Sequence, residues 1–172
     1  MNSVYKKLKK NIINAGPLLL LYYLSFSEID TYFSSFFEIL SFNLQLIIIY
    51  YWTLKDHSIL GYGHIFLAGI INDLVMGLPM GLSTLLYLTT AFVASYVKNV
   101  TVNISLFSDW FTFLIAVFFT QLVFVILTSN FSNIDFFYID LFYNSFFTLL
   151  LYPFFWIIFN IYKSIMIINH NE

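Results

Sequence analysis

Charge, cysteine and arginine are scarce or missing in this chain of 172 residues. Only 9% of the residues are charged, cysteine is absent, and all seven basic residues are lysines. A soluble domain carries about 25% charged residues, so this chain has too few to cover a surface that faces water. The lack of cysteine excludes a disulfide, a thiolate metal site and a thiol nucleophile. The formal charge of −2 gives no indication of a basic face for nucleic acid.

Apolar side chains take the place of the missing charges. Hydrophobic residues make up 60% of the chain and aromatic residues 22%, which excludes a disordered protein, since disorder requires low hydrophobicity. This length and composition predict one domain, residues 1–172, whose solvent is largely hydrocarbon. We therefore expect an integral membrane protein.

Six apolar segments approach the length of about 20 residues that a helix needs to cross a bilayer. They lie near residues 12–26, 36–54, 62–78, 82–97, 106–129 and 139–162. The first follows a basic cluster and precedes only a weak cleavage signal, so we interpret it as an anchor rather than a signal peptide. The third and fourth are short and joined by the tight turn GLPMG at residues 77–81, so a hairpin that does not fully cross stays an alternative.

The positions of the lysines predict the orientation, because cytoplasmic loops retain positive charge. With six spans and the N-terminus inside, the lysine cluster at residues 6–10 falls on the cytoplasmic side together with Lys55, Lys98 and Lys163. Five spans would place either that cluster or Lys163 outside. The predicted fold is therefore an all-α bundle of six transmembrane helices with both termini inside.

One acid, Asp73, lies within a predicted span. An acid at the bilayer centre costs about 2.5–3.5 kcal/mol on insertion scales, so it should face protein or water. Gly69, Asp73 and Gly77 recur every four residues and form a stripe of small and polar side chains, a pattern that favours close helix contacts. The candidate packing or partner-binding residues are Gly69, Asn72, Asp73, Gly77, Pro79 and Gly81.

Three interpretations of Asp73 are open. It is a structural hydrogen-bonding group for Thr84, Tyr87 or Thr90 of the next span, a docking point for the helix of another membrane protein, or an ion-carrying group of a transporter. No second acid or base is expected deep in a span, which disfavours a proton relay. The structural interpretation is preferred, because hydrogen bonds between helices are common in bundles.

Polar and aromatic residues of the last span and the span ends predict structural roles. Asn144, Thr148 and Tyr152 form a stripe beside Pro153, which should kink the helix and free a carbonyl group. The tryptophans that we expect to anchor the chain at the membrane interface are Trp52, Trp110 and Trp156.

Catalytic signatures are missing from the sequence. It contains no zinc-protease, hydrolase, P-loop or dinucleotide-binding motif. Its three histidines are scattered singly along the chain, which is not the spacing of a metal site. We therefore expect no enzyme activity, no cofactor and no metal.

One stretch of the chain carries a family resemblance. Residues 43–52 read NLQLIIIYYW, and after a short polar loop residues 63–96 read GHIFLAGIINDLVMGLPMGLSTLLYLTTAFVASY. Its distinctive features are Tyr51-Trp52, Gly69-x-x-x-Asp73-x-x-x-Gly77 and Gly81-Leu82. In this order they resemble the rod-shape-determining membrane protein MreD family. The family often has proline just before the second span, where this chain has Phe42.

The resemblance implies a non-enzymatic scaffold of the cell-elongation machinery in the bacterial inner membrane. Such proteins bind an MreC-like single-span protein and link cytoskeletal MreB to the cell-wall synthases, including RodA and its transpeptidase. The family is also similar in helical layout to the substrate-binding components of energy-coupling-factor vitamin transporters, which implies small-molecule uptake as the alternative. Those components carry Ala-x-x-x-Ala on the first helix, whereas here Ala15 is followed four residues later by Leu19. Because fold analogy does not fix function, both hypotheses stay open, with the scaffold preferred.

Overall fold

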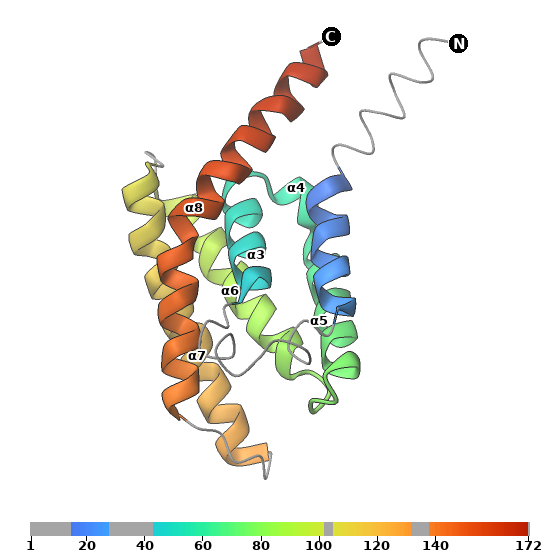
Figure 1. The fold of residues 1–172 in the computed structure, drawn as a ribbon, viewed down its shortest axis with the longest axis vertical. Coiled ribbons are helices and arrows are strands. Elements are labelled where there is room, and N and C mark those ends of the chain that lie inside the picture. The colour runs from blue at the N-terminus through green and yellow to red at the C-terminus, as the bar shows by residue number, and fades with distance from the viewer. Residues whose placement is uncertain (1–14, 28–42, 102–104, 132–137, 172) are drawn as a thin grey trace, which may run out of the picture.

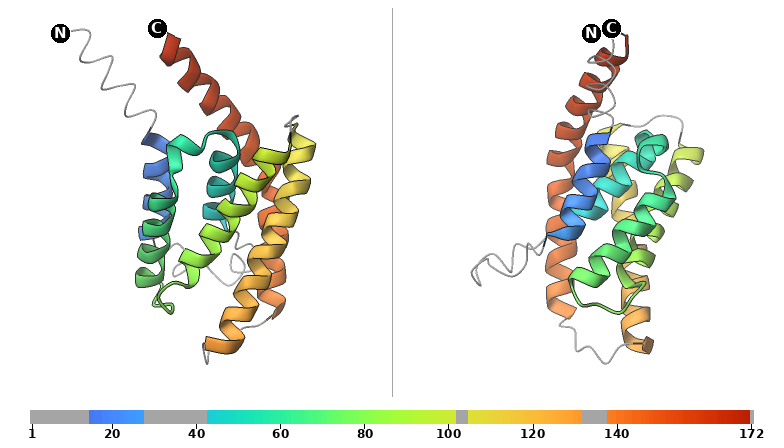
Figure 2. Two further views of the ribbon diagram at one scale, coloured as in Figure 1. Left: turned by 180° about the vertical axis from the view of Figure 1, so that it is seen from behind. Right: turned by 90° about the vertical axis from the view of Figure 1, so that its right-hand side faces the viewer.

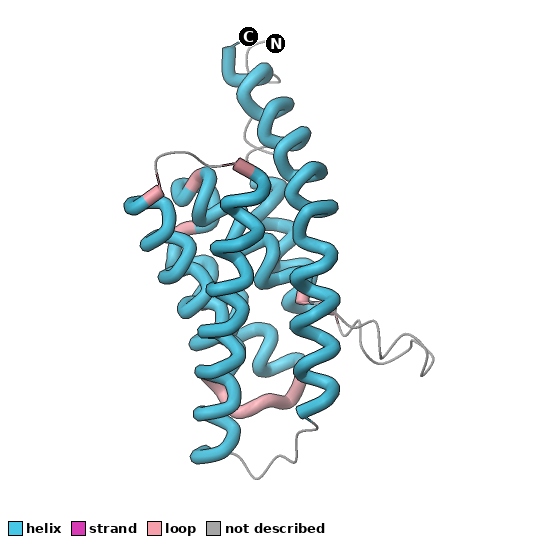
Figure 3. Tube along the Cα trace, turned by 90° about the vertical axis from the view of Figure 1, so that its left-hand side faces the viewer, coloured by secondary structure: helices cyan, strands magenta, loops and turns pink. Residues whose placement is uncertain are grey.

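The computed structural model describes residues 15–27, 43–101, 105–131 and 138–171, and within these ranges it contains helices and no strand. The all-α prediction is therefore confirmed for the described part of the chain (Figure 3). The helices are an N-terminal helix (Ala15–Phe26), α3 (Leu44–Lys55), α4 (His57–Leu60), α5 (Tyr62–Val75), α6 (Leu82–Val100), α7 (Leu106–Phe131) and α8 (Tyr138–Asn171). Residues 12–14 and 36–42, which the sequence assigns to the first two spans, lie outside the described ranges.

Apart from the short α4, successive helices run in alternating directions (Figures 1 and 2). The turn between α5 and α6 therefore lies at one end of the bundle, and the connection between α3 and α4 lies at the other. At that second end, Lys163 lies close enough to Lys55 and Lys98 for their positive charges to act on its ammonium group. We call it the lysine end, and the grouping of these three lysines agrees with the alternation that the sequence predicts.

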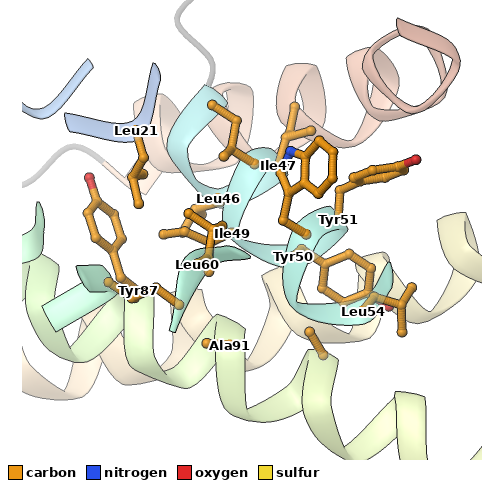
Figure 4. Close-up of a cluster of buried hydrophobic side chains, with 14 of the residues drawn as sticks. Leu21, Leu46, Ile47, Ile49, Tyr50, Tyr51, Leu54, Leu60, Tyr87 and Ala91 are labelled. Atoms are coloured by element: carbon orange, nitrogen blue, oxygen red, sulfur yellow. The ribbon is translucent and has the colours of Figure 1, made fainter. Parts of the chain in front are cut away.

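Helix α3 is the centre of the core. All nine side chains of residues 46–54 are buried, because the N-terminal helix, α6, α7 and α8 surround the helix. Figure 4 shows Leu46 and Ile49 of α3 among Leu21, Tyr87 and Ala91 of the helices around it. Trp52 is 1% exposed and belongs to this core, so its predicted role as an interfacial anchor is wrong.

Helices α7 and α8 are the two described helices that are long and apolar enough to cross a membrane. Only 28% of the apolar stretch of α7 and 17% of that of α8 are buried within the protein. The core helix of a soluble protein would be mostly buried, so the outward faces of α7 and α8 are better suited to contact hydrocarbon.

The six-span bundle is not confirmed and stays a prediction. Helix α3 has 12 residues and α5 has 14, so at 1.5 Å per residue each spans about 18–21 Å, against a hydrocarbon core of about 30 Å. Helix α6 has 19 residues, but its serines, threonines and Lys98 lower its mean hydropathy. It is therefore not among the helices apolar enough to cross a membrane. An apolar run of 10–14 residues is typical of a buried core helix, and α3 takes that role.

Candidate functional site

Asp73 lies near the end of α5 and is fully buried. Its Oδ1 accepts a hydrogen bond from the backbone N–H of Ser83, and its Oδ2 accepts one from the N–H of Gly81, both at 2.8 Å. The hydroxyl of Thr84 lies 3.5 Å from Oδ2. The first amides of a helix have no partner within the helix and carry partial positive charge. Asp73 therefore caps the N-terminus of α6 from the neighbouring helix.

The turn between α5 and α6 places Asp73 at this position. Gly77 has φ +64° and Gly81 has φ +97°, a left-handed backbone conformation that glycine adopts without steric cost. The N–H of Leu78 donates to the carbonyl of Asp73 at 2.9 Å, as in a Schellman motif that ends a helix at glycine. Pro79 is exposed, and its carbonyl accepts a hydrogen bond from Leu82. Because the turn begins inside the predicted span, α5 ends at Val75 rather than at residue 78.

Gly69 is a point of close approach between α5 and α6. A Cβ added to Gly69 would overlap the backbone of Thr84 and lie 2.8 Å from its nitrogen. Any larger side chain would therefore push the two helices apart. The absence of a side chain at Gly69 therefore allows the close contact between α5 and α6 within the chain.

Asn72 links α5 directly to α6 and α3, and through Gln45 to the N-terminal helix. Its side-chain nitrogen donates to the hydroxyl of Ser83 at 3.0 Å, and its oxygen lies 3.5 Å from the side-chain nitrogen of Gln45 on α3. Gln45 also donates to the carbonyl of Leu24 in the N-terminal helix at 3.3 Å. We call Gln45, Asn72, Asp73 and Ser83 the capping cluster.

This geometry bears on the three interpretations of Asp73. Two backbone amides and one hydroxyl surround the carboxylate, which supports a structural hydrogen-bonding role. Of the predicted side-chain partners, Thr84 is the one whose hydroxyl forms a hydrogen bond with Asp73. The hydroxyl of Tyr87 interacts with Asp73 electrostatically, and Thr90 pairs with Thr120 at 2.9 Å. The face that carries Gly69 and Asp73 is already covered by α6, which leaves no room there for the helix of another protein.

Asp109, in the first turn of α7, is a second buried acid, with 2% of its surface exposed. Its Oδ2 lies 2.8 Å from the ammonium nitrogen of Lys55 and accepts a hydrogen bond of 2.8 Å from the indole N–H of Trp156. Lys163 donates to the carbonyl of Lys55 at 3.3 Å. The sequence analysis singled out Asp73 alone, whereas the structure buries a second acid in the first turn of α7. We call Lys55, Asp109 and Trp156 the charged triad.

The charged triad joins three helices at the lysine end. Lys55 is the last residue of α3, Asp109 lies in the first turn of α7, and Trp156 lies in α8. Lys55 also lies 5.7 Å from the ring centroid of Trp156, within the range of a cation–π contact. The sequence contained an indication of the Lys55–Asp109 pair. The predicted alternation of the spans puts the end of the second span and the start of the fifth span on the same side of the membrane.

Pro153 lies inside α8, and this helix bends along its length in Figure 1. Proline removes the N–H that would bond the carbonyl four residues earlier, which is that of Leu149. The indole N–H of Trp110 donates to this carbonyl at 2.9 Å. The sequence predicts the freed carbonyl, but it gives no indication that Trp110 satisfies it.

No metal-binding arrangement is found among the described residues, which contain no group of three or more histidine, aspartate or glutamate side chains. His64 instead lies 3.0 Å from the hydroxyl of Tyr22 through its Nδ1. Comparison with protein families, with curated proteins and with solved structures finds no match to this chain.

Proposed function

We propose that this protein is a non-enzymatic scaffold of the bacterial inner membrane, with the cell-elongation complex as its setting. The proposal takes the resemblance of residues 43–96 to the MreD family as its starting point. The proposed partner is an MreC-like protein with a single transmembrane helix. MreB, RodA and the RodA-associated transpeptidase are the proposed members of the wider assembly.

The observation that carries the proposal is the contrast between a hydrogen-bonded interior and an apolar exterior. The carboxylates of Asp73 and Asp109 are both bonded within the chain. Large apolar side chains cover the outside of the described helices, with Phe92 of α6 at 69%, Phe118 of α7 at 63% and Phe154 of α8 at 59% exposed. Exposed apolar side chains on several helices are suited to contact lipid or another apolar helix. Recognition would then occur by helix packing within the membrane.

The outward faces of α7 and α8 are favoured as the place of contact. The Gly69 face of α5 is covered by α6, so it supports the fold of the chain rather than a partner. Most of the apolar stretches of α7 and α8 stay exposed. A single-span helix is apolar along its whole length, so it can pack against either surface without leaving hydrocarbon.

Co-purification tests the proposal. The tagged full chain is co-expressed with an MreC-like single-span protein and isolated in mild detergent, with an unrelated single-span protein as the control. Specific recovery of the MreC-like protein is expected. Loss of that protein during isolation, although it is stably expressed, would overturn the proposal.

Photocrosslinking locates the contact. A photoreactive amino acid is placed at Leu74, Phe92, Phe118 or Phe154, which are exposed positions on four different helices. Buried Ala91 is the matched control position. Adducts with the partner are expected at Phe118 or Phe154 and not at Ala91.

Uptake measurements address the transport alternative. Cells that express the chain together with energy-coupling components are assayed for accumulation of labelled vitamins. Uptake that depends on the chain, combined with no capture of the MreC-like protein, would replace the scaffold hypothesis with transport.

A further inference from the structure

Gln121 is a polar side chain in the middle of α7 that the fold leaves without a hydrogen bond. Along the same stretch, Thr112, Thr120 and Thr128 each donate to a backbone carbonyl one turn earlier, at 2.8–2.9 Å. The amide of Gln121 makes no such bond to any residue that the structure describes. Gln121 is partly exposed, and its amide atoms are not enclosed by the described residues. The amide is therefore open to a group outside the chain.

The depth of Gln121 keeps its amide from water in the membrane setting proposed above. The apolar stretch of α7 runs from Leu106 to Ser129, which places Gln121 about 5 Å from its midpoint along the helix axis. A hydrocarbon core about 30 Å thick then leaves about 10 Å between Gln121 and the nearer boundary. This is farther than a glutamine side chain extends. Since hydrocarbon offers no hydrogen bonds, the amide needs a polar group from another helix.

Gln121 also belongs to a regular line of side chains on α7. Spacings of three and four residues alternate along Phe111, Leu114, Phe118, Gln121 and Val125, which we call the α7 seam. The first three are exposed and the other two are partly exposed. A repeat of this kind lets a second helix pack along the first at a crossing angle of about 20°. One polar residue within such a seam specifies the register and the number of helices that associate.

We propose that the α7 seam binds the α7 seam of a second copy of this chain, as a parallel dimer in which the two Gln121 amides pair. A primary amide both donates and accepts, so it is complementary to itself. A two-fold axis along the membrane normal brings the two amides to the same depth. Lipid can cover the phenylalanines of the seam but cannot bond the amide, and a different helix would need a polar group at this depth.

The available surface is large enough for such a dimer. Together with the flanking Ile115 and Leu122, the α7 seam exposes roughly 500 Å² of apolar side chain on each copy. Pairing would bury about 1,000 Å² in total, the size that a specific interface reaches. The outward face of α8 around Phe154 stays available for the single-span partner. The inference rests on the membrane setting of the proposed function and is independent of that partner's identity.

Förster transfer in liposomes tests the pairing. The full chain is labelled with donor or acceptor dye at Met80→Cys and diluted over a range of protein-to-lipid ratios in phosphatidylethanolamine and phosphatidylglycerol. A reversible dimer is expected. Gln121→Leu should weaken it about 5- to 30-fold, the effect of one hydrogen bond between helices, and Gln121→Asn should weaken it less. Asn160→Leu, which removes an exposed amide of α8, is the matched control and should leave the dimer unchanged.

The opposite results are equally clear. Wild-type protein that stays monomeric at every ratio would overturn the proposal and leave lipid on the seam, and equal dimerisation of Gln121→Leu would overturn the amide pair. The unfolding midpoint of Gln121→Leu should match that of the wild type, and a lower one would show that the amide bonds within the chain, against the proposal. These samples contain no other protein, so their outcome is separate from the co-purification that tests the scaffold.

Oxidative crosslinking locates the interface. In membranes that hold the full chain, Phe118→Cys should form a disulfide-linked dimer, because the two seams face each other. Phe92→Cys, at an exposed position of α6, is the control and should not. Crosslinking at residue 92 and not at residue 118 would place the contact between copies elsewhere and overturn the proposal.

Discussion

The indole nitrogen of Trp110 donates a hydrogen bond of 2.9 Å to the carbonyl oxygen of Leu149. This carbonyl has lost its usual helical donor, because Pro153 has no N–H. A side chain of α7 thus supplies the bond that is missing within α8. In hydrocarbon, where no water is available, an unsatisfied carbonyl costs several kcal/mol, so this contact ties the bend of α8 to the helix beside it.

If the bundle lies in hydrocarbon as proposed, Trp110→Phe should therefore destabilise the protein by about 1–3 kcal/mol, the cost of an acceptor left unsatisfied away from water. In a Pro153→Ala background the loss should be smaller, because the new backbone N–H can bond Leu149 directly. Thermal unfolding midpoints of the two single variants and the double variant form the required cycle. An equal loss from Trp110→Phe in both backgrounds would contradict the proposed role of the indole.

Asp73 should tolerate replacement by asparagine better than replacement by alanine. Asparagine has one acceptor oxygen for the amides of Gly81 and Ser83, and its NH2 group faces the other donor, so Asp73→Asn should cost about 1–3 kcal/mol. Asp73→Ala leaves both amides without the carboxylate and should cost more. Asp140→Asn, at an exposed residue in the first turn of α8, is the control. Midpoints for Asp73→Asn that match those of Asp140→Asn would refute the capping role.

The α5–α6 hairpin was the most predictable part of the molecule. Its GLPMG turn and the four-residue spacing from Gly69 to Gly77 indicate a reversal and a close contact, and the structure contains both. The bonding partners of Asp73 were less predictable. Side-chain patterns suggest side-chain partners such as Thr84, whereas the short bonds come from the backbone amides of Gly81 and Ser83. Because every residue type other than proline has a backbone N–H, the sequence pattern gives no indication of such partners.

Gly69→Ala should be destabilising although alanine favours helices. The added Cβ overlaps the Thr84 backbone, and overpacking of a tight contact typically costs about 1–3 kcal/mol. Gly63→Ala, in the same helix, places its Cβ where nothing lies within 4 Å. It should be neutral or stabilise by about 0.4–1 kcal/mol. Thermal unfolding of the two variants in parallel measures the difference, and equal effects would contradict the close approach at Gly69.

The position of α3 and the burial of Asp109 could not be derived from the sequence. Hydropathy does not distinguish a side chain that faces lipid from one that faces another helix, so the apolar run ending at Trp52 predicted a span with an interfacial anchor. In the structure, residues 46–54 are instead surrounded by protein. Asp109 lies at the start of an apolar segment, where an acid is expected to reach solvent. Its burial depends on Lys55, a residue 54 positions earlier in the chain.

Breaking the Lys55–Asp109 pair should have a larger effect than removing both charges. Lys55→Met leaves the buried carboxylate without its cation, which typically costs about 3–5 kcal/mol. Lys55→Met combined with Asp109→Leu removes the unpaired charge and should recover most of that loss, although the indole of Trp156 then loses its acceptor. Unfolding midpoints of the single and double variants provide the comparison. A double variant less stable than Lys55→Met alone would show that the pair has another role.

Single cysteines can test the predicted orientation, because the chain contains no cysteine of its own. Met80 is 73% exposed in the turn between α5 and α6, and Lys98 is exposed near the end of α6 at the lysine end. If the lysine end faces the cytoplasm, as the distribution of lysines predicts, a membrane-impermeant maleimide added to intact spheroplasts should label Met80→Cys and not Lys98→Cys. Both should react once the membrane is opened. Labelling of Lys98→Cys in intact spheroplasts would reverse the orientation. Labelling of neither position until lysis would show that the α5–α6 turn does not reach the outer surface, and that the hairpin enters the membrane without crossing it.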